Sequence, residues 1–305
     1  MKDKETEPLQ SKCGYIAIIG KPNVGKSTLL NCLVRQKLSI TSRKPQTTRH
    51  QLLGIRSTER VQYLYVDTPG IHKNSGKALN RYMNKAAKSI VSDVDVVLLV
   101  LDRNRLDEED ELAIDYLGAS RAQLVIGINK MDRMPSKEAL LPHIKYISGR
   151  LPGIDIVPVS ARTGYNVEHL EALLASKLPE EPFIFPVDQL TDRSERFLVS
   201  ELIREKMVRQ LGKELPYELA IGIETFSEQG NIVHIDAVCW LERESQKGIV
   251  VGKGGSRLKS IATDARRDIE KLLDRKVMLR IYAKARTGWS DNERILNNLG
   301  YISDS

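Results

Sequence analysis

The sequence predicts an α/β protein, with a first domain built on a mostly parallel sheet and a second, smaller α+β domain. Two patterns and a break between them support this fold class. From residue 14 to about 178, short runs rich in Val, Ile and Leu alternate with amphipathic stretches, as in strands buried on both faces of a sheet and connected by helices. Three prolines between 178 and 186 interrupt the pattern. A helix–strand–strand–helix–helix–strand order follows.

The bulk properties fit this division. A chain of 305 residues is long enough for about two domains. The contents of 41% hydrophobic and 29% charged residues are typical of a soluble globular protein. No apolar run approaches the roughly 20 residues that cross a bilayer, and residues 1–7 lack the apolar core of a signal peptide.

Charge and cysteine content narrow the setting further. A net charge of +7 and an isoelectric point near 9.2 favour an anionic partner. The three cysteines are far apart, which disfavours a disulfide framework or a zinc site and suits a reducing cytoplasm.

The first predicted strand, 15–19, ends at a glycine-rich loop, and a helix is predicted over 27–33. The loop fits the pattern Gly-x4-Gly-Lys-Ser/Thr with Gly20, Lys21, Pro22, Asn23, Val24, Gly25, Lys26, Ser27 and Thr28. Its backbone N–H groups and the helix N-terminus would surround a phosphate. Lys26 would then reach the β- and γ-phosphates and Ser27 would bind Mg²⁺. The alternative, a glycine-rich turn that binds nothing, is disfavoured by the strand before the loop and the helix after it.

Polar motifs also follow three of the other predicted strands, 61–66, 124–128 and 154–159, whereas 94–101 is a buried strand without one. The motifs are Asp67-Thr68-Pro69-Gly70, Asn129-Lys130-Met131-Asp132 and Ser160-Ala161. Ligands of parallel sheets bind beyond the carboxyl ends of the strands, so the four motifs are expected to meet at one edge.

These motifs predict a guanine nucleotide as the ligand. Asp67 would hold Mg²⁺, directly or through water, and the Gly70 N–H would approach the γ-phosphate. The Asp132 carboxylate could accept the N1–H and N2–H₂ groups of guanine, a donor pair that adenine lacks. Ser160-Ala161 could present a backbone N–H to guanine O6. Each motif alone is common in surface loops, but their order after a phosphate loop is a strong joint signal.

Two further segments have the character of switch loops. The stretch 41–50 could fold over the γ-phosphate and supply a hydroxyl to Mg²⁺, from either Thr47 or Thr48; a basic solvated loop is the alternative. The polar, glycine-bearing stretch 71–77 could be the second switch.

The residue expected to orient the attacking water is missing. Ras-like GTPases carry a glutamine after the Asp-x-x-Gly glycine, and here Ile71 has no hydrogen-bonding group. His72 is one conceivable substitute, although a lone loop histidine is more often solvated. Asn23 could instead bind a monovalent cation such as K⁺ beside the phosphates, or could only shape the turn.

The second half begins with a helix over 192–211 after the proline-rich linker. Strands over 219–223 and 232–241 form a hairpin with a turn at 227–231, and 277–284 is the third strand. The tail, 288–301, is predicted to form a short amphipathic helix. Trp289 and Tyr301 could stack on bases, but a role as core anchors of that helix is favoured.

Between these strands lies a second glycine loop. Gly252-Lys253-Gly254-Gly255 matches the Gly-x-x-Gly loop with which KH domains clamp single-stranded RNA. Its alternative is a loose glycine turn. Residues 243–286 hold 13 basic and 5 acidic side chains, a difference of +8, which favours RNA. One apolar face is predicted for the following helix: Leu258, Ile261, Ala262, Ala265, Ile269, Leu272 and Leu273. The candidate RNA-binding residues are Lys247, Val251, Gly252, Lys253, Gly254, Gly255, Arg257 and Lys259.

With both halves considered, the chain resembles the Era-like GTPase family, bacterial GTPases of small-ribosomal-subunit assembly with a C-terminal type II KH domain. The resemblance covers nearly the whole length. Besides the motifs above, it rests on Gln46-Thr47-Thr48-Arg49-His50, Val251, Thr191-Asp192-Arg193-Ser194 and Gly288-Trp289. The hydrophobic Ile71 agrees with this branch of GTPases.

The resemblance implies a function and completes the candidate site. It implies GTP hydrolysis and favours Thr48 as the Mg²⁺ ligand that joins Ser27 and Asp67. The candidate catalytic residues are then Lys26, Thr48 and Asn23, of which Asn23 is chosen from the residues alone. The resemblance also implies binding to the 3′ end of 16S rRNA, a role in 30S assembly, and peripheral association with the inner face of the cell membrane. We expect a cytoplasmic monomer. The expected domains are a disordered segment 1–12, a GTPase domain 13–179, a linker 180–190 and a KH domain with its tail 191–305.

Other functions remain open at this point. A signalling GTPase acting on protein effectors is disfavoured by the basic glycine-loop domain and by the lack of a C-terminal lipidation cysteine. A GTPase subunit of an RNA-modifying enzyme would need a catalytic cysteine or cofactor motif, which is not apparent. A constitutive RNA-binding module with a vestigial nucleotide site is the non-enzymatic alternative.

Overall fold

The computed structural model describes residues 11–42, 51–68, 93–103, 106–118, 123–136, 138–211 and 219–288. By its contacts the chain divides into two compact units. The first contains the described residues 11–38, 51–68 and 93–192, and the second contains 39–42 and 193–288. Each unit has its own hydrophobic core.

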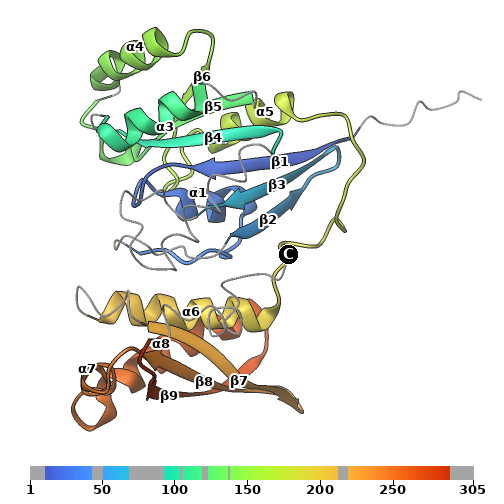
Figure 1. The fold of residues 1–305 in the computed structure, drawn as a ribbon. Helices are drawn as coiled ribbons and strands as arrows, with labels where there is room; N and C mark the ends of the chain where they lie inside the picture. The colour runs from blue at the N-terminus through green and yellow to red at the C-terminus, as the bar shows by residue number, and fades with distance from the viewer. Residues whose placement is uncertain are drawn as a thin grey trace, which may run out of the picture. The chain divides into compact units, whose positions relative to one another are not determined.

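The first unit is a six-stranded sheet with helices on both faces (Figure 1). Its elements in chain order are β1 (Lys12–Ile19), α1 (Lys26–Val34), β2 (Leu52–Ser57), β3 (Val61–Asp67), β4 (Val96–Asp102), α3 (Glu108–Gly118), β5 (Gln123–Asn129), α4 (Leu141–Arg150), β6 (Asp155–Pro158) and α5 (Val167–Lys177). The strand order is β2-β3-β1-β4-β5-β6, and all neighbours are parallel except β2, which runs antiparallel to β3. The mostly parallel sheet was predicted, but its edge strand β2 was not.

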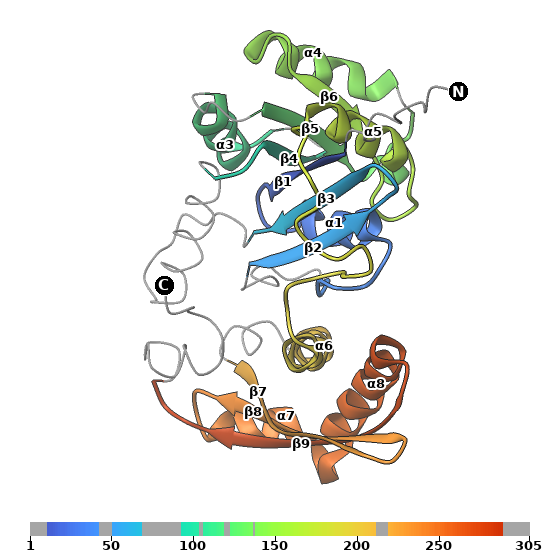
Figure 2. The same cartoon turned by 90° about the vertical axis from the view of Figure 1, so that its right-hand side faces the viewer.

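The core of this sheet explains its continuous apolar strands. The first six residues of β4 are all buried, because helices cover both faces of the central strands. On one face Ile114 and Leu117 of α3 and Ile147 of α4 pack against strand residues such as Leu99. Figure 2 shows α1 and α5 on the opposite face. The loops at the carboxyl ends of the strands are thereby held on a rigid layer.

The segment predicted as a linker is bound to the first unit. The buried Gln62 side chain accepts hydrogen bonds from the N–H groups of Ile184 (2.9 Å) and Phe185 (3.0 Å) and donates one to the Phe185 carbonyl (2.8 Å). Farther along, the N–H of Ile55 in β2 donates to the Leu190 carbonyl at 2.8 Å. The proline-rich composition therefore marks an extended strap that lies along β2 and β3 (Figure 2). The detailed domain boundaries remain a prediction.

The second unit packs two helices on a three-stranded sheet. Its elements are α6 (Glu195–Gln210), β7 (Leu219–Gln229), β8 (Ile232–Leu241), α7 (Ser245–Val251), α8 (Ser256–Leu273) and β9 (Lys276–Ala285). Strand β8 is central, antiparallel to β7 and parallel to β9. Figure 2 shows α6 and α8 on the same side of this sheet. The predicted order of helices and strands is confirmed.

Local sequence explains two of these helices. Helix α6 begins after Ser194, whose side chain accepts a hydrogen bond from the Phe197 N–H, as an N-cap does. In α8 the predicted apolar face is confirmed: its fully buried members share the core with the sheet, and the rest pack partly against it. The buried members are Ile261, Ala265, Ile269 and Leu273.

Candidate nucleotide site and nucleic-acid interface

The predicted nucleotide motifs meet at one edge of the first sheet. Strands β1, β3, β4, β5 and β6 are parallel, so their carboxyl ends lie at the same edge. The phosphate loop follows β1, Asp67 ends β3, Asn129 ends β5 and Ser160 follows β6. Hydrogen bonds between the loops then fix their relative positions.

The phosphate loop requires glycine at two positions. Gly20 has φ 149°, and a Cβ there would lie 2.4 Å from the Val100 carbonyl oxygen. Gly25 has φ 106°, and a Cβ would lie 2.3 Å from Asn129 Nδ2. Any side chain would therefore push the loop off its neighbouring strand ends. Asn23 sits at the exposed tip of the loop in a left-handed conformation, with φ 64°.

Lys26 lies inside the loop. Its side chain is buried, and its Nζ donates hydrogen bonds to the carbonyls of Gly20 (2.7 Å) and Lys21 (2.9 Å). Burial lowers the pKa of Lys26 to about 8, although the nearby Asp67 carboxylate opposes the shift. The loop thus holds the lysine cation against its own backbone carbonyls, at the start of α1, where a phosphate would be expected to bind.

The oxygen ligands expected for Mg²⁺ are adjacent. Ser27 Oγ donates to Asp67 Oδ2 at 2.9 Å, and Asp67 is fully buried. Thr68 Oγ1 donates to the Ile18 carbonyl at 3.0 Å, which fixes the end of β3 beside β1. A hydroxyl and a carboxylate are the hard donors that Mg²⁺ prefers, with phosphate oxygens completing its shell. These two residues therefore fit the ion. In the described ranges no group of three His, Cys, Asp or Glu side chains could hold a metal by itself.

Asn129 joins the phosphate loop to the loop after β6. Its Nδ2 donates to the Val24 carbonyl at 2.8 Å, and its Oδ1 accepts from the Ala161 N–H at 2.9 Å. The side chain is almost completely buried, so both of its bonds are made inside the protein. Asn129, the first residue of the guanine motif, therefore holds these two loops together.

Asp132, the predicted guanine ligand, is held in place by the loop after β6. Ser160 Oγ donates to Asp132 Oδ1 at 2.8 Å, and Arg162 lies 3.7 Å from Asp132 Oδ2. Met131–Arg133 form a short 3₁₀ turn that begins after Lys130, which has φ 69°. The Lys130 ammonium pairs with Asp102 at the end of β4 (2.5 Å).

Part of the predicted site lies outside the described residues. This applies to the Mg²⁺ ligand candidates Thr47 and Thr48, to Pro69, Gly70, Ile71 and His72, and to the aromatic tail residues Trp289 and Tyr301. Their assigned roles remain predictions.

One contact of the phosphate loop was not predicted from the sequence. The Lys21 ammonium lies 2.6 Å from a carboxylate oxygen of Asp107 and 2.6 Å from one of Asp110. A signal was present, since Asp107-x-x-Asp110 has the spacing of a helix capping box. Nothing in the sequence indicated that the phosphate loop would reach it.

The second glycine loop has the expected backbone. Gly252, Gly254 and Gly255 have φ values of 74°, 59° and 78°. A Cβ on Gly254 would meet nothing within 4 Å, so this glycine faces open space. Such a loop at the start of α8 lets main chain and helix N-terminus approach a nucleic-acid phosphate closely.

The basic candidates around this loop fall into two groups. Lys253 and Lys259 are exposed. By contrast, Lys247 pairs with Glu244 at 2.7 Å, and Arg257 donates to the Ile249 carbonyl at 2.6 Å. Arg257 therefore helps to hold α7 against the start of α8, and its assignment to RNA binding remains a prediction.

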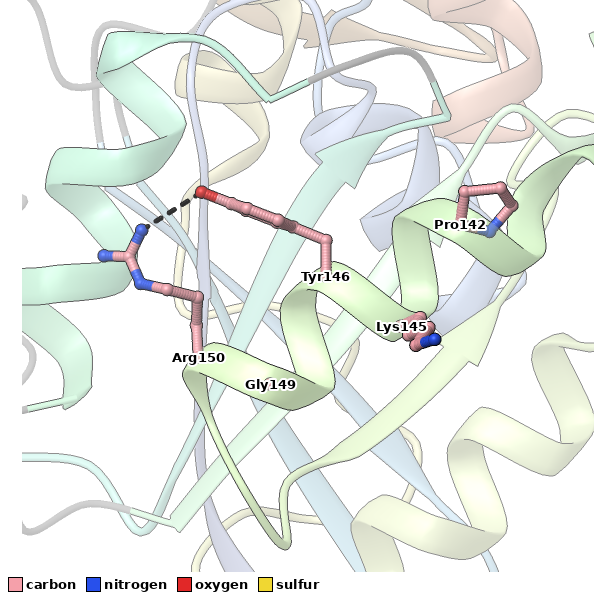
Figure 3. A pocket seen from close by; sticks show the side chains of 5 residues that line it. All are labelled: Pro142, Lys145, Tyr146, Gly149 and Arg150. Atoms are coloured by element: carbon pink, nitrogen blue, oxygen red, sulfur yellow. Dashed lines mark hydrogen bonds between the residues drawn. The ribbon is translucent and has the colours of Figure 1, made fainter.

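A surface hollow lies elsewhere in the first unit. It is lined by residues of α4 alone: Pro142, Lys145, Tyr146, Gly149 and Arg150 (Figure 3). Arg150 Nη1 donates to Tyr146 Oη at 3.3 Å. None of these residues belongs to the nucleotide motifs, so the hollow is separate from the site. In the described part of the chain no helix is long and apolar enough to cross a membrane.

Fold and site together define a P-loop GTPase domain followed by a KH domain. Comparisons with known proteins agree: a family model described as "50S ribosome-binding GTPase" matches residues 15–130, and one described as "KH domain" matches residues 214–290.

Relatives of the whole chain give its family. GTPase Era of Pseudomonas savastanoi pv. phaseolicola is 54% identical over 291 residues, covering 95% of this chain and 97% of that protein. The crystal structure of a single-residue variant of Aquifex aeolicus Era bound to GDP·AlF₄⁻ has a TM-score of 0.92 at 34% identity. Era in complex with MgGDPNP and nucleotides 1506–1542 of 16S ribosomal RNA has a TM-score of 0.93 at 34% identity. Both cover 96% of this chain and 100% of theirs. The chain belongs to the Era family of GTPases.

Proposed function

We propose that this protein binds and hydrolyses GTP and binds the 3′ end of 16S rRNA during 30S subunit assembly. The proposal rests mainly on the two hydrogen bonds of the Asn129 side chain, which join the phosphate loop to the Ser160-Ala161 loop. Ser160 in turn holds the Asp132 carboxylate, so the residues expected to bind the phosphates and the base are preorganised together. The complex of an Era relative with a GTP analogue and a 16S rRNA segment supports the same partners here.

During hydrolysis, different residues of the first unit would bind the base, the phosphates and the metal ion. Asp132 accepts the guanine N–H groups, while the loop N–H groups and the Lys26 ammonium hold the phosphates and stabilise the charge that develops on transfer. Mg²⁺, held by Ser27 and Asp67 with Thr48 as its proposed third ligand, would supply further charge neutralisation when bound. No general base is identified among the described residues near the phosphate loop, so positioning and electrostatics would carry the rate.

Asn23 is our candidate for the missing water-positioning element. It lies at the exposed tip of the phosphate loop, where its side-chain oxygen could hold K⁺ beside the phosphates. The expected result is faster GTP turnover in potassium than in sodium buffer, with the difference lost in Asn23→Ala. Equal rates in the two buffers for the unaltered protein would remove this role and leave Asn23 as a turn residue.

The GTP state is proposed to control RNA engagement. Thr41 and Ser42 begin the first predicted switch loop, and by their contacts they belong to the second unit. Within that unit, Arg209 of α6 donates to the Thr41 carbonyl at 2.9 Å and to Thr41 Oγ1 at 2.9 Å. Ordering of the loop by γ-phosphate and Mg²⁺ would therefore act on a segment that already contacts α6.

We infer the RNA target from the rRNA-bound relative and not from the description of the GTPase family model. That label names the 50S subunit but covers only residues 15–130, whereas the likeness to Era includes the KH domain. We further propose a cytoplasmic monomer. Peripheral membrane association rests on the resemblance alone, and flotation with lipid vesicles would test it.

Crosslinking to total cellular RNA tests the proposed target. We expect the crosslinks to concentrate in the last segment of 16S rRNA and to require the second glycine loop. Guanine-nucleotide hydrolysis should be measured on the same preparation, with Lys26→Ala as its inactive control. Hydrolysis without any RNA crosslink would favour a signalling GTPase, and RNA binding without hydrolysis would favour a constitutive RNA-binding module. Either outcome contradicts the proposal.

A further inference from the structure

The Lys21 side chain reaches from the phosphate loop to the start of α3. Its ammonium forms ion pairs with Asp107 and Asp110, both at 2.6 Å. Only 17% of the Lys21 side chain and 2% of the Asp110 side chain are exposed. A pair this well shielded from solvent is held in one geometry far better than a surface ion pair.

The two carboxylates that receive Lys21 also cap α3. Asp107 Oδ1 accepts from the N–H groups of Glu109 (3.0 Å) and Asp110 (3.2 Å), and Asp110 Oδ2 accepts from the Asp107 N–H (3.2 Å). This reciprocal pattern is a capping box, which fixes both carboxylates. Burial lowers the pKa of Lys21, but the hydrogen bonds to both carboxylates outweigh it, so its pKa is raised and the ammonium stays charged.

Helix α3 does not need this lysine for its own stability. A cation near a helix N-terminus opposes the helix dipole, and the capping carboxylates already favour that end. The helix is also fastened to its surroundings: Ile114 and Leu117 are buried in the sheet core, and Glu111 pairs with Arg150 of α4 at 2.5 Å. The start of α3 is therefore held in place without Lys21, whereas the phosphate loop is held by the ion pairs that Lys21 forms with α3.

The anchor acts on the carbonyls that aim the catalytic lysine. Lys26 Nζ donates to the backbone carbonyls of Gly20 and Lys21, the same turn that the Lys21 side chain ties down. We propose that Lys21, held by Asp107 and Asp110, is a positioning residue that preorganises the phosphate loop for the nucleotide. Without it, the first turn of the loop would have to be ordered when the nucleotide binds, at a cost in affinity. This inference rests on the proposed binding of GTP.

Four variants test the anchor: Lys21→Met, Lys21→Arg, Asp110→Asn and the double variant Lys21→Met/Asp110→Asn. Lys177→Met is the matched control, because Lys177 forms a comparable ion pair with Asp155 (2.8 Å) at a place outside the nucleotide motifs. The measurements are Kd for GDP and for a non-hydrolysable GTP analogue, KM and kcat for GTP, and the melting temperature.

We expect Lys21→Met and Asp110→Asn each to weaken binding of both nucleotides and to raise KM about tenfold, the equivalent of about 1.4 kcal/mol. The turnover number kcat should stay within about twofold, because uniform binding is lost rather than transition-state stabilisation. The double variant should be no worse than about twofold beyond Lys21→Met, since Lys21→Met already removes both ion pairs. Lys21→Arg should recover affinity to within about threefold, and Lys177→Met should match the unaltered protein.

Two results would overturn the proposal. In the first, Lys21→Met binds nucleotide as tightly as the unaltered protein, whatever its melting temperature, which would mean that the ion pair is only structural. In the second, Lys21→Met is impaired while Asp110→Asn is not, which would mean that Asp110 does not hold the lysine. If Asp110→Asn does not fold, the comparison of Lys21→Met with Lys21→Arg decides. Failure of the unaltered protein to bind guanine nucleotides would instead refute the proposed function.

Discussion

At the scale of single residues, we propose that Asp132 carries the base specificity. Its carboxylate is oriented by Ser160 and has no competing cation closer than Arg162 at 3.7 Å among the contacts of the described residues. A carboxylate can only accept hydrogen bonds, and guanine offers two N–H groups on one edge. Selectivity against adenine therefore follows from one functional group.

Asp132→Asn should weaken GDP binding by about 100-fold, because two charge-assisted hydrogen bonds of about 1.5–3 kcal/mol each are replaced by a mismatched amide. Titration calorimetry with GDP measures the loss. Asp155→Asn removes a half-exposed carboxylate at the start of β6 and should leave the affinity unchanged. Retention of tight, guanine-selective binding by Asp132→Asn would show that another group reads the base.

Lys26 makes nucleotide binding depend on pH. Burial favours the neutral amine and lowers its pKa to about 8 in the nucleotide-free protein, while bound phosphates favour the charged form and raise the pKa again. Binding above pH 8 should therefore take up protons, and affinity should fall as pH rises through about 8.

Calorimetry of GDP binding in two buffers of different ionisation enthalpy measures this uptake. At pH 8.5 we expect uptake of a substantial fraction of one proton per nucleotide, and near pH 7.5 a clearly smaller fraction, because more of the lysine is already charged there. An observed binding enthalpy that does not change with the buffer at pH 8.5 would contradict the assignment.

At the scale of elements, the Gln62 side chain binds the segment that was predicted as a linker to the first unit. Its four polar contacts with the strap and with Ser57 come from a side chain that is fully buried in β3. Gln62→Ala should cost about 2–3 kcal/mol of stability in the first unit, the range for a buried hydrogen-bond group that loses its partners.

Hydrogen exchange and urea unfolding check this prediction. The amides of Ile184 and Phe185 should lose protection in Gln62→Ala. Gln123→Ala is the control, because Gln123 is exposed and makes one side-chain hydrogen bond to the Lys177 carbonyl. Unchanged protection at 184–185 in Gln62→Ala would mean that the strap is held by Phe183 and Phe185 packing alone.

The glycine loop of the second unit permits a matched pair of substitutions. Gly254 and Gly230 have nearly the same φ (59° and 60°), and a Cβ at either would meet nothing within 4 Å. Aspartate tolerates this left-handed conformation better than most residues. Gly254→Asp should weaken RNA binding at least about tenfold, because its carboxylate would face the RNA phosphates.

Gly230→Asp introduces the same charge at the tip of the β7–β8 hairpin and should leave RNA affinity within about twofold. Both proteins should melt near the temperature of the unaltered one. Filter binding with the 16S 3′ segment measures the difference. Equal losses in the two variants would show that net charge, rather than the loop, governs binding.

At the scale of the whole molecule, the sequence predicts what local chemistry dictates and misses what depends on tertiary contact. The phosphate loop, Asp67 and Asn129–Asp132 could be located because each is a fixed motif at a strand end. Strand β2 was missed because Gly54 and Arg56 interrupt its apolar pattern and only pairing with β3 defines it.

Two further misses have the same cause. The anchor between Lys21 and Asp110 joins positions 89 residues apart, and Gln62 captures a segment more than 120 residues away. The sequence does not show which residue a polar side chain in a strand or a loop will contact. Such contacts become visible only when the fold brings the elements together.

The central claim is that one chain couples the state of a guanine nucleotide to the grip of a KH domain on RNA. The affinity for the 16S 3′ segment, measured with GTP analogue and Mg²⁺, with GDP, and without nucleotide, tests it most directly. We expect the tightest binding with the GTP analogue, by about tenfold or more over GDP, which corresponds to about 1.4 kcal/mol of coupling. Identical affinities in all three states would contradict it.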